Sequence, residues 1–212
     1  MTGSNGRVST EQSRALQIYK LLMDEVKIRV GIIERALDGE IVVPGMMIRE
    51  ICYLQLRMIC EIIALGCLVA HGDITATRSG KLPKEYNADR IVSLLGKLHP
   101  AFYPKPMRAT GVKPHPSGIG RVHHFDPVKT GFLTKSELAH LSNKSGDFLH
   151  RGTMRKLLSP EPIDVGFPDV VVWVNKIIVL LTAHSLSLFD DREFLCTVWE
   201  TADNQVHTAL TA

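Results

Sequence analysis

The segment most informative about the fold runs from Ile48 to Ala70 and reads IREICYLQLRMICEIIALGCLVA. Apolar residues lie on most sides of a helix drawn through it, which is typical of a helix buried on all sides. Pro44 suits the first turn of such a helix, because the ring of proline fixes a helical φ and no backbone donor is lost there. We therefore expect a central helix from Pro44 to about Ala70 that stops near Gly72.

Four further helices are expected around this segment. Ser9 or Thr10 can cap one that runs to about Leu37, and Asn87 can cap another that ends near Leu98. The sequence Thr134-Lys135-Ser136-Glu137 is typical of a capping box and predicts a helix to about Leu158. The apolar segment from Asp169 to Phe189 predicts one buried helix by its length.

The remaining segments predict a loop and a hairpin. Five prolines fall between Pro100 and Pro116, so residues 99–125 are expected to form one long Pro/Gly-rich basic loop. Residues 194–211 predict a β-hairpin at the C-terminal end. The expected fold is mainly α: a helical bundle in a single domain, residues 1–212, with residues 1–9 flexible.

Composition and cysteine spacing indicate a soluble, cytoplasmic protein. Cys52, Cys60 and Cys67 are eight and seven residues apart, so neighbouring thiols lie about 10–12 Å apart along one helix, too far for a disulfide or a shared metal. The longest apolar run, Ile62 to Ala70, is far shorter than the roughly 20 residues that span a bilayer. We expect buried free thiols, no cofactor, no metal and no membrane partner.

The helix after Thr134 carries the most informative surface. Its polar stripe holds His140, Lys144, Asp147 and Arg151, and a strip of small residues, Ala139, Ser142, Gly146 and Thr153, has His150 at its margin. Small residues let a second helix approach closely, and glycine otherwise weakens a helix. The charged residues Glu50, Arg57 and Glu61 share one side of the central helix. In one interpretation they form an exposed stripe or an internal ion pair. In the other they face the helix that carries His150.

The segment LSNKSGDFLHRG, from Leu141 to Gly152, resembles a motif of HEPN-like helical proteins. That superfamily consists of helical bundles, often dimeric, that occur in phage defence, toxin–antitoxin pairs and RNA cleavage. Its ribonucleases carry an arginine four to six residues before the histidine, whereas this chain has Lys144 there, with five residues between it and His150. The resemblance implies a site with His150 as acid/base or phosphate ligand, Lys144 and Arg151 as phosphate contacts, and Asp147 orienting.

The predicted basic loop is a second candidate site. No acidic residue occurs from Arg90 to Phe125, and the candidate phosphate contacts are Lys105, Arg108, Lys113 and Arg121. Basic residues interleaved with aromatic ones can follow a phosphate backbone and stack on bases. The alternative is a solubilising loop folded over the bundle.

The segment from Asp126 to Glu137 approximates an EF-hand calcium loop. Val128 stands at its third position and cannot coordinate calcium through its side chain, and the capping box explains Thr134 and Glu137 without an ion. Whether this segment binds calcium stays open.

Together these features predict a HEPN-like protein of a nucleic-acid-linked stress or phage-defence process, either RNA-binding or a ribonuclease. Its expected partners are RNA or another phosphate-bearing ligand and a second copy of the chain in a homodimer. The alternative is a non-enzymatic dimerising protein-interaction module.

Overall fold

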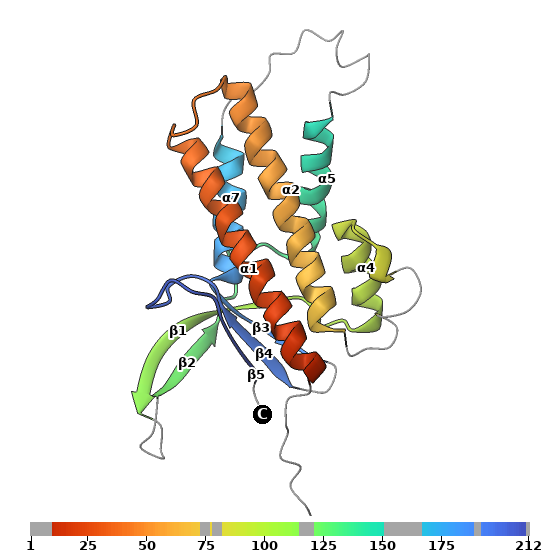
Figure 1. Ribbon diagram of the computed structural model, residues 1–212, viewed down its shortest axis with the longest axis vertical. Helices are drawn as coiled ribbons and strands as arrows, with labels where there is room; N and C mark the ends of the chain where they lie inside the picture. The colour runs from red at the N-terminus through yellow and green to blue at the C-terminus, as the bar shows by residue number, and fades with distance from the viewer. Residues whose placement is uncertain are drawn as a thin grey trace, which may run out of the picture.

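The computed structural model describes residues 10–72, 77, 82–114, 121–150, 167–188 and 192–210, and it places a group of helices above a twisted sheet (Figure 1). The helices are α1 (Thr10–Leu37), α2 (Gly45–Ala70), α4 (Ala88–Leu98), α5 (Lys135–Leu149) and α7 (Pro168–Leu181), with a short 3₁₀ turn at Leu82–Lys84. The strands are β1 (Lys105–Pro114), β2 (Arg121–Pro127), β3 (Ala183–Ser187), β4 (Glu193–Thr197) and β5 (His207–Leu210).

The strands form one antiparallel five-stranded sheet in the order β2-β1-β3-β4-β5. This finding overturns the expected helical bundle, because the fold is mixed α/β with a sizeable sheet. Residues 99–125 are not one long loop, since they contain all of β1 and most of β2. The predicted C-terminal hairpin exists as β4 and β5, but it continues the sheet through β3.

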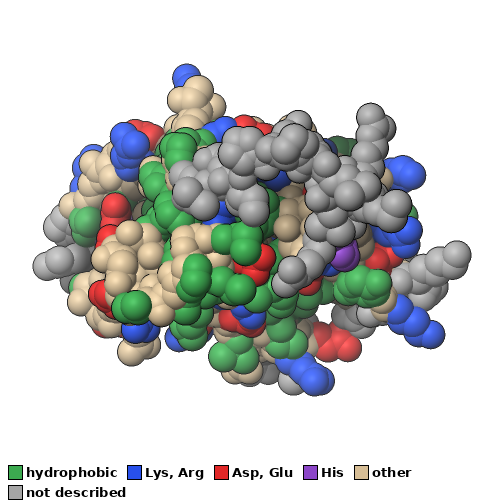
Figure 2. Space-filling model, turned by 90° about the horizontal axis from the view of Figure 1, so that it is seen from above, with side chains coloured by type: hydrophobic (Ala, Val, Ile, Leu, Met, Phe, Trp, Pro, Cys, Tyr) green, Lys and Arg blue, Asp and Glu red, His purple; other side chains and the backbone are tan. Residues whose placement is uncertain are grey.

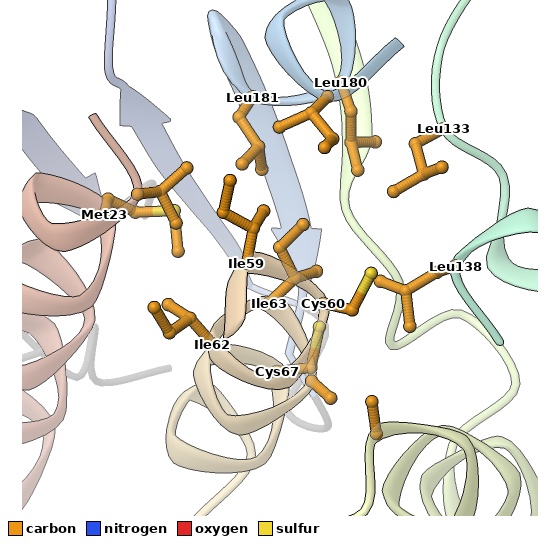
Figure 3. Close-up of a cluster of buried hydrophobic side chains, with 14 of the residues drawn as sticks. Met23, Ile59, Cys60, Ile62, Ile63, Cys67, Leu133, Leu138, Leu180 and Leu181 are labelled. Atoms are coloured by element: carbon orange, nitrogen blue, oxygen red, sulfur yellow. The ribbon is translucent and has the colours of Figure 1, made fainter. Parts of the chain in front are cut away.

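The central position of α2 is confirmed. It contacts α1, α4, α5 and α7, and its side chains Ile59, Ile63 and Cys67 lie in the core (Figure 3). Within the described ranges α2 alone is long and apolar enough to cross a membrane, but most of it is buried inside the protein, as in the core helix of a folded domain. All four cysteines are free and buried, as expected for the three of α2.

Local capping signals placed the starts of α4 and α5 correctly. The Asn87 side chain accepts a hydrogen bond from the backbone N–H of Arg90, and Thr134 and Glu137 complete the capping box of α5. The described part of α5 ends at Leu149 with His150 as its C-cap, and residues 151–158 of the predicted helix lie outside the described residues.

The predicted helix from Asp169 to Phe189 was wrong in its second half. The helix α7 ends at Leu181, and Ala183–Ser187 pairs with β4 instead. Periodicity does not separate a buried strand from a buried helix in so apolar a segment, and pairing with a distant strand decides it here.

The end of the molecule opposite the sheet is partly apolar (Figure 2). Val42 and Val43, between α1 and α2, are exposed, and so are Val171 and Val172 near the start of α7. Exposed apolar clusters of this kind often mark contact surfaces. The homodimer stays a prediction.

Candidate functional site

A polar cleft of about 400 Å³ opens between α2, α5 and the start of α4. Two charged residues of α2 and a set of polar residues of α5 form its walls, and two residues that precede α4 complete it: Arg57, Glu61, Ser142, Asn143, Gly146, Asp147, His150, Tyr86 and Asn87. The α5 residues share one face because residues three and four apart are neighbours on a helix. Features of both alternatives for the α2 charges are present, because Arg57 and Glu61 line the cleft opposite α5 and also form an ion pair with each other.

An internal ion pair orients the arginine of this cleft. The Nε of Arg57 donates to Oε1 of Glu61 at 3.2 Å, and the two side chains are 36% and 20% exposed. A Cβ placed at Gly146 would lie 3.7 Å from Nη1 of Arg57, so this nitrogen is directed at α5. Neither Nη nitrogen makes a hydrogen bond with the residues that the structure describes, and both remain available to a ligand.

The loop in front of α4 is also held in place. Oε1 of Glu85 accepts hydrogen bonds from the backbone N–H groups of Tyr86, at 3.1 Å, and Asn87, at 3.0 Å. The bond from Asn87 is the main cause of the lowered pKa of Glu85. The loop thus presents Tyr86 at the cleft from a fixed backbone.

The structure brings two of the predicted catalytic residues to the cleft. His150 and Asp147 line it, and both are exposed. Lys144 does not line it, because its Nζ reaches Asp169 of α7 at 3.1 Å. Arg151 lies outside the described residues. The cation that lines the cleft together with His150 is therefore Arg57 of α2.

Asp169 collects three side-chain donors at the start of α7. It accepts hydrogen bonds from Arg49 at 3.0 Å, from Lys144 and from the hydroxyl of Tyr53. The Tyr53 ring stacks on Phe148 with centroids 4.4 Å apart, and the Arg49 guanidinium lies within 5.4 Å of both centroids. The network ties α7 to α2 and α5.

The electrostatics of this network assign Lys144 to the fold. Partial burial raises the pKa of Asp169, but the hydrogen bonds from Tyr53 and Lys144 and the charge of Arg49 outweigh it and hold the pKa below its usual value. Sequence reasoning missed Arg49, Tyr53 and Asp169 as a group. Tyr53 and Arg49 precede Asp169 by 116 and 120 positions, and no local sequence signal links residues so far apart.

The predicted basic loop is a two-stranded arm, which we call the basic arm and define as residues 105–114 and 121–127. Lys105 and Pro106 pair with β3, whereas residues 107–114 pair with β2 alone. The arm therefore leaves the sheet and projects from the molecule (Figure 1). At about 3.4 Å per residue, its free part is roughly 25 Å long.

The strand register gives the basic arm two different faces. Arg108 lies opposite Asp126 and Lys113 opposite Val122. On the other face Ala109 lies opposite Phe125 and Val112 opposite His123, and the rings of His123 and Phe125 stack with centroids 6.4 Å apart.

Of the four predicted phosphate contacts, Arg108 and Lys113 are exposed and bond to no described residue. Lys105 sits at the base of the arm, where its Nζ donates to Oγ of Ser187 at 2.6 Å. Arg121 belongs to β2, but its side chain lies outside the described residues.

The candidate calcium loop has its last carboxylate engaged elsewhere. Glu137 accepts a hydrogen bond from the backbone N–H of Thr134 at 2.9 Å and pairs with Lys176, and Asp126 belongs to β2. Among the described residues no group of three or more His, Cys, Asp or Glu could hold a metal ion. Glu137 thus has a structural role at the start of α5.

No protein-family model, curated protein or solved structure matches this chain. The function is therefore inferred from the geometry of the cleft and of the basic arm.

Proposed function

We propose that this protein binds single-stranded nucleic acid through the basic arm. The observation that carries the proposal is the projection of a two-stranded ribbon with the exposed cations Arg108 and Lys113 on one face and the rings of His123 and Phe125 on the other. A single-stranded nucleic acid that crosses the open edge of β2 can contact both faces of the basic arm, because β2 is the edge strand of the sheet.

The charge distribution supports a phosphate-bearing partner. The whole chain carries 25 Lys and Arg against 22 Asp and Glu, a net charge of +3. The basic arm contains Lys105, Arg108, Lys113 and Arg121 with Asp126 as its one acidic residue, so its own charge equals the whole of this excess. Cations that bind phosphates release condensed counterions, which makes such binding favourable and sensitive to salt.

The apolar face supports a single-stranded partner. His123 is exposed and Phe125 is half-buried, so both rings can meet unstacked bases. Stacking of a base on an aromatic side chain contributes about 1–3 kcal/mol and tolerates any base sequence. In a duplex the base faces are covered, and this contribution is lost.

The state of the predicted catalytic residues favours binding over cleavage. Lys144 is paired with Asp169, and the carboxylate of Glu61, which accepts a hydrogen bond from Nε of Arg57, offsets the positive charge of that guanidinium. A ribonuclease needs a cation that stabilises the charge developing on the scissile phosphate. The proposal is therefore a binding protein without nuclease activity.

The test is fluorescence anisotropy with labelled single-stranded RNA and DNA oligonucleotides and their duplexes, over a series of salt concentrations. The variant Arg108→Gln/Lys113→Gln should lower the affinity about tenfold or more and reduce the salt slope by about 1.4, which is about 0.7 for each phosphate left without its cation. Phe125→Leu should weaken binding with little change in the slope. The matched control is Arg14→Gln/Lys97→Gln, which removes two exposed cations from α1 and α4.

Equal affinity of the arm variant and the control would overturn the proposal, and so would a preference for duplexes. No retention of any oligonucleotide at low salt, together with a concentration-dependent dimer in sedimentation, would favour the protein-interaction module. RNA cleavage that is abolished in His150→Ala would favour the ribonuclease.

A further inference from the structure

We propose that the cleft between α2, α5 and the start of α4 binds a nucleoside. This site is separate from the basic arm, and the inference does not rest on nucleic-acid binding there. Three properties of the lining residues support it: their fixed positions, their near-neutral total charge and the flat groups among them.

Two parts of the cleft wall, the Arg57 side chain and the backbone before α4, are held in place before any ligand binds. Arg57 is held by Glu61, and the backbone of Tyr86 and Asn87 is held by Glu85. Asn87 also caps α4 through its Oδ1. A preformed site spends little binding free energy on ordering its own side chains.

The charges of the described lining residues favour a neutral ligand. Arg57 is the one Lys or Arg among its described lining residues, and the carboxylate of Glu61 balances it. Asp147 adds a second negative charge to the lining, and a negative charge disfavours a phosphate. A free phosphate or a polyphosphate is thus disfavoured here, whereas a neutral molecule with several donors and acceptors is not.

The shapes and hydrogen-bonding groups point to a planar heterocycle. Tyr86 is 73% exposed and offers a flat aromatic surface, and the guanidinium of Arg57 is a second planar group. Bases stack on both kinds of surface. Asn143 and Asp147 make no side-chain hydrogen bond with the described residues, so an amide and a carboxylate are available to a base edge. A sugar alone would leave the planar groups unmatched.

The experiment titrates the full chain with adenosine, guanosine, cytidine and uridine, followed by isothermal calorimetry. Ribose and inorganic phosphate serve as comparison ligands. We expect at least one nucleoside to saturate the protein. Tyr86→Ala should weaken its binding about tenfold or more, as removal of a stacking partner does elsewhere, while Tyr86→Phe keeps the ring and retains binding.

A second variant tests the location independently. Gly146→Leu places a side chain into the cleft beside Arg57 and should abolish binding, and its melting temperature reports whether it folds. The arm variant Arg108→Gln/Lys113→Gln should bind the nucleoside as the unmodified protein does, which separates this inference from the proposed function. The inference is overturned if no nucleoside saturates the protein, if ribose or phosphate binds as tightly, or if Tyr86→Ala or a folded Gly146→Leu leaves the affinity unchanged.

Discussion

Acid should destabilise this protein through one buried histidine. His184 of β3 is fully buried, its Nδ1–H donates to the carbonyl of Leu181 at 3.1 Å, and its Nε2 accepts from the hydroxyl of Tyr19 at 2.7 Å. This bonding uses the neutral ring, because the carbonyl fixes the proton on Nδ1 and the hydroxyl donates to Nε2. Burial lowers the pKa of His184 from 6.5 to about 4.

The direction and size of the change in unfolding free energy follow from the difference between the pKa of His184 in the unfolded and the folded chain. Below pH 6.5 the unfolded chain takes up a proton at this residue, and the folded chain does not until about pH 4. The free energy of unfolding therefore falls as the pH falls through this window and is unaffected by this group above it. At about 1.36 kcal/mol for each pH unit, the decrease amounts to about 3 kcal/mol.

Urea unfolding at a series of pH values measures this decrease, with His184→Asn as the variant that cannot titrate. The unmodified protein should lose about 3 kcal/mol more than the variant between pH 7 and pH 4. Carboxylates such as Asp169 titrate in both proteins and cancel in the comparison. Parallel dependences of the unfolding free energy on pH for the two proteins would contradict this expectation. If the variant does not fold, an NMR titration in which the His184 ring takes up its proton near pH 6.5 would refute it as well.

Three substitutions test the packing. Gly146→Ala should raise the free energy of unfolding by up to about 1 kcal/mol, because alanine favours the helix and the added Cβ meets only an ordinary contact at 3.7 Å; a decrease of stability in chemical denaturation would contradict this. Gly66→Ala should instead lower the melting temperature, since its Cβ would lie 3.1 Å from the Tyr19 ring where α1 and α2 meet, and an unchanged melting temperature would count against that tight packing. Asp169→Asn should cost about 2–3 kcal/mol in urea unfolding at pH 7, since three donors lose a charged acceptor. The control is Asp203→Asn, which removes the carboxylate of the exposed pair between Asp203 and His207. Equal losses of unfolding free energy in the two variants would show that the Asp169 network does not stabilise α7.

The candidate cleft could be predicted in part. Residue spacing placed His150 near a crossing of two helices and put Arg57 and Glu61 on one side of α2, whereas Asp147 joined the predicted site through the family resemblance. The spacing could not show that Lys144 turns away toward Asp169 or that Tyr86 closes the third side. Those positions depend on how α7 and the loop before α4 pack against the other helices, which no local pattern records.

Local sequence determined the helices, because a helix satisfies its backbone within itself and its ends are marked by nearby side chains such as Asn87 and Thr134. The tertiary structure decided the sheet, because each strand finds its hydrogen-bonding partner elsewhere in the chain. The strand β1 was not predicted because its segment contains prolines, and β3 was not predicted because its apolar sequence continues that of α7. The basic residues were visible in the sequence, but only strand pairing turned a predicted loop into a projecting arm with two distinct faces.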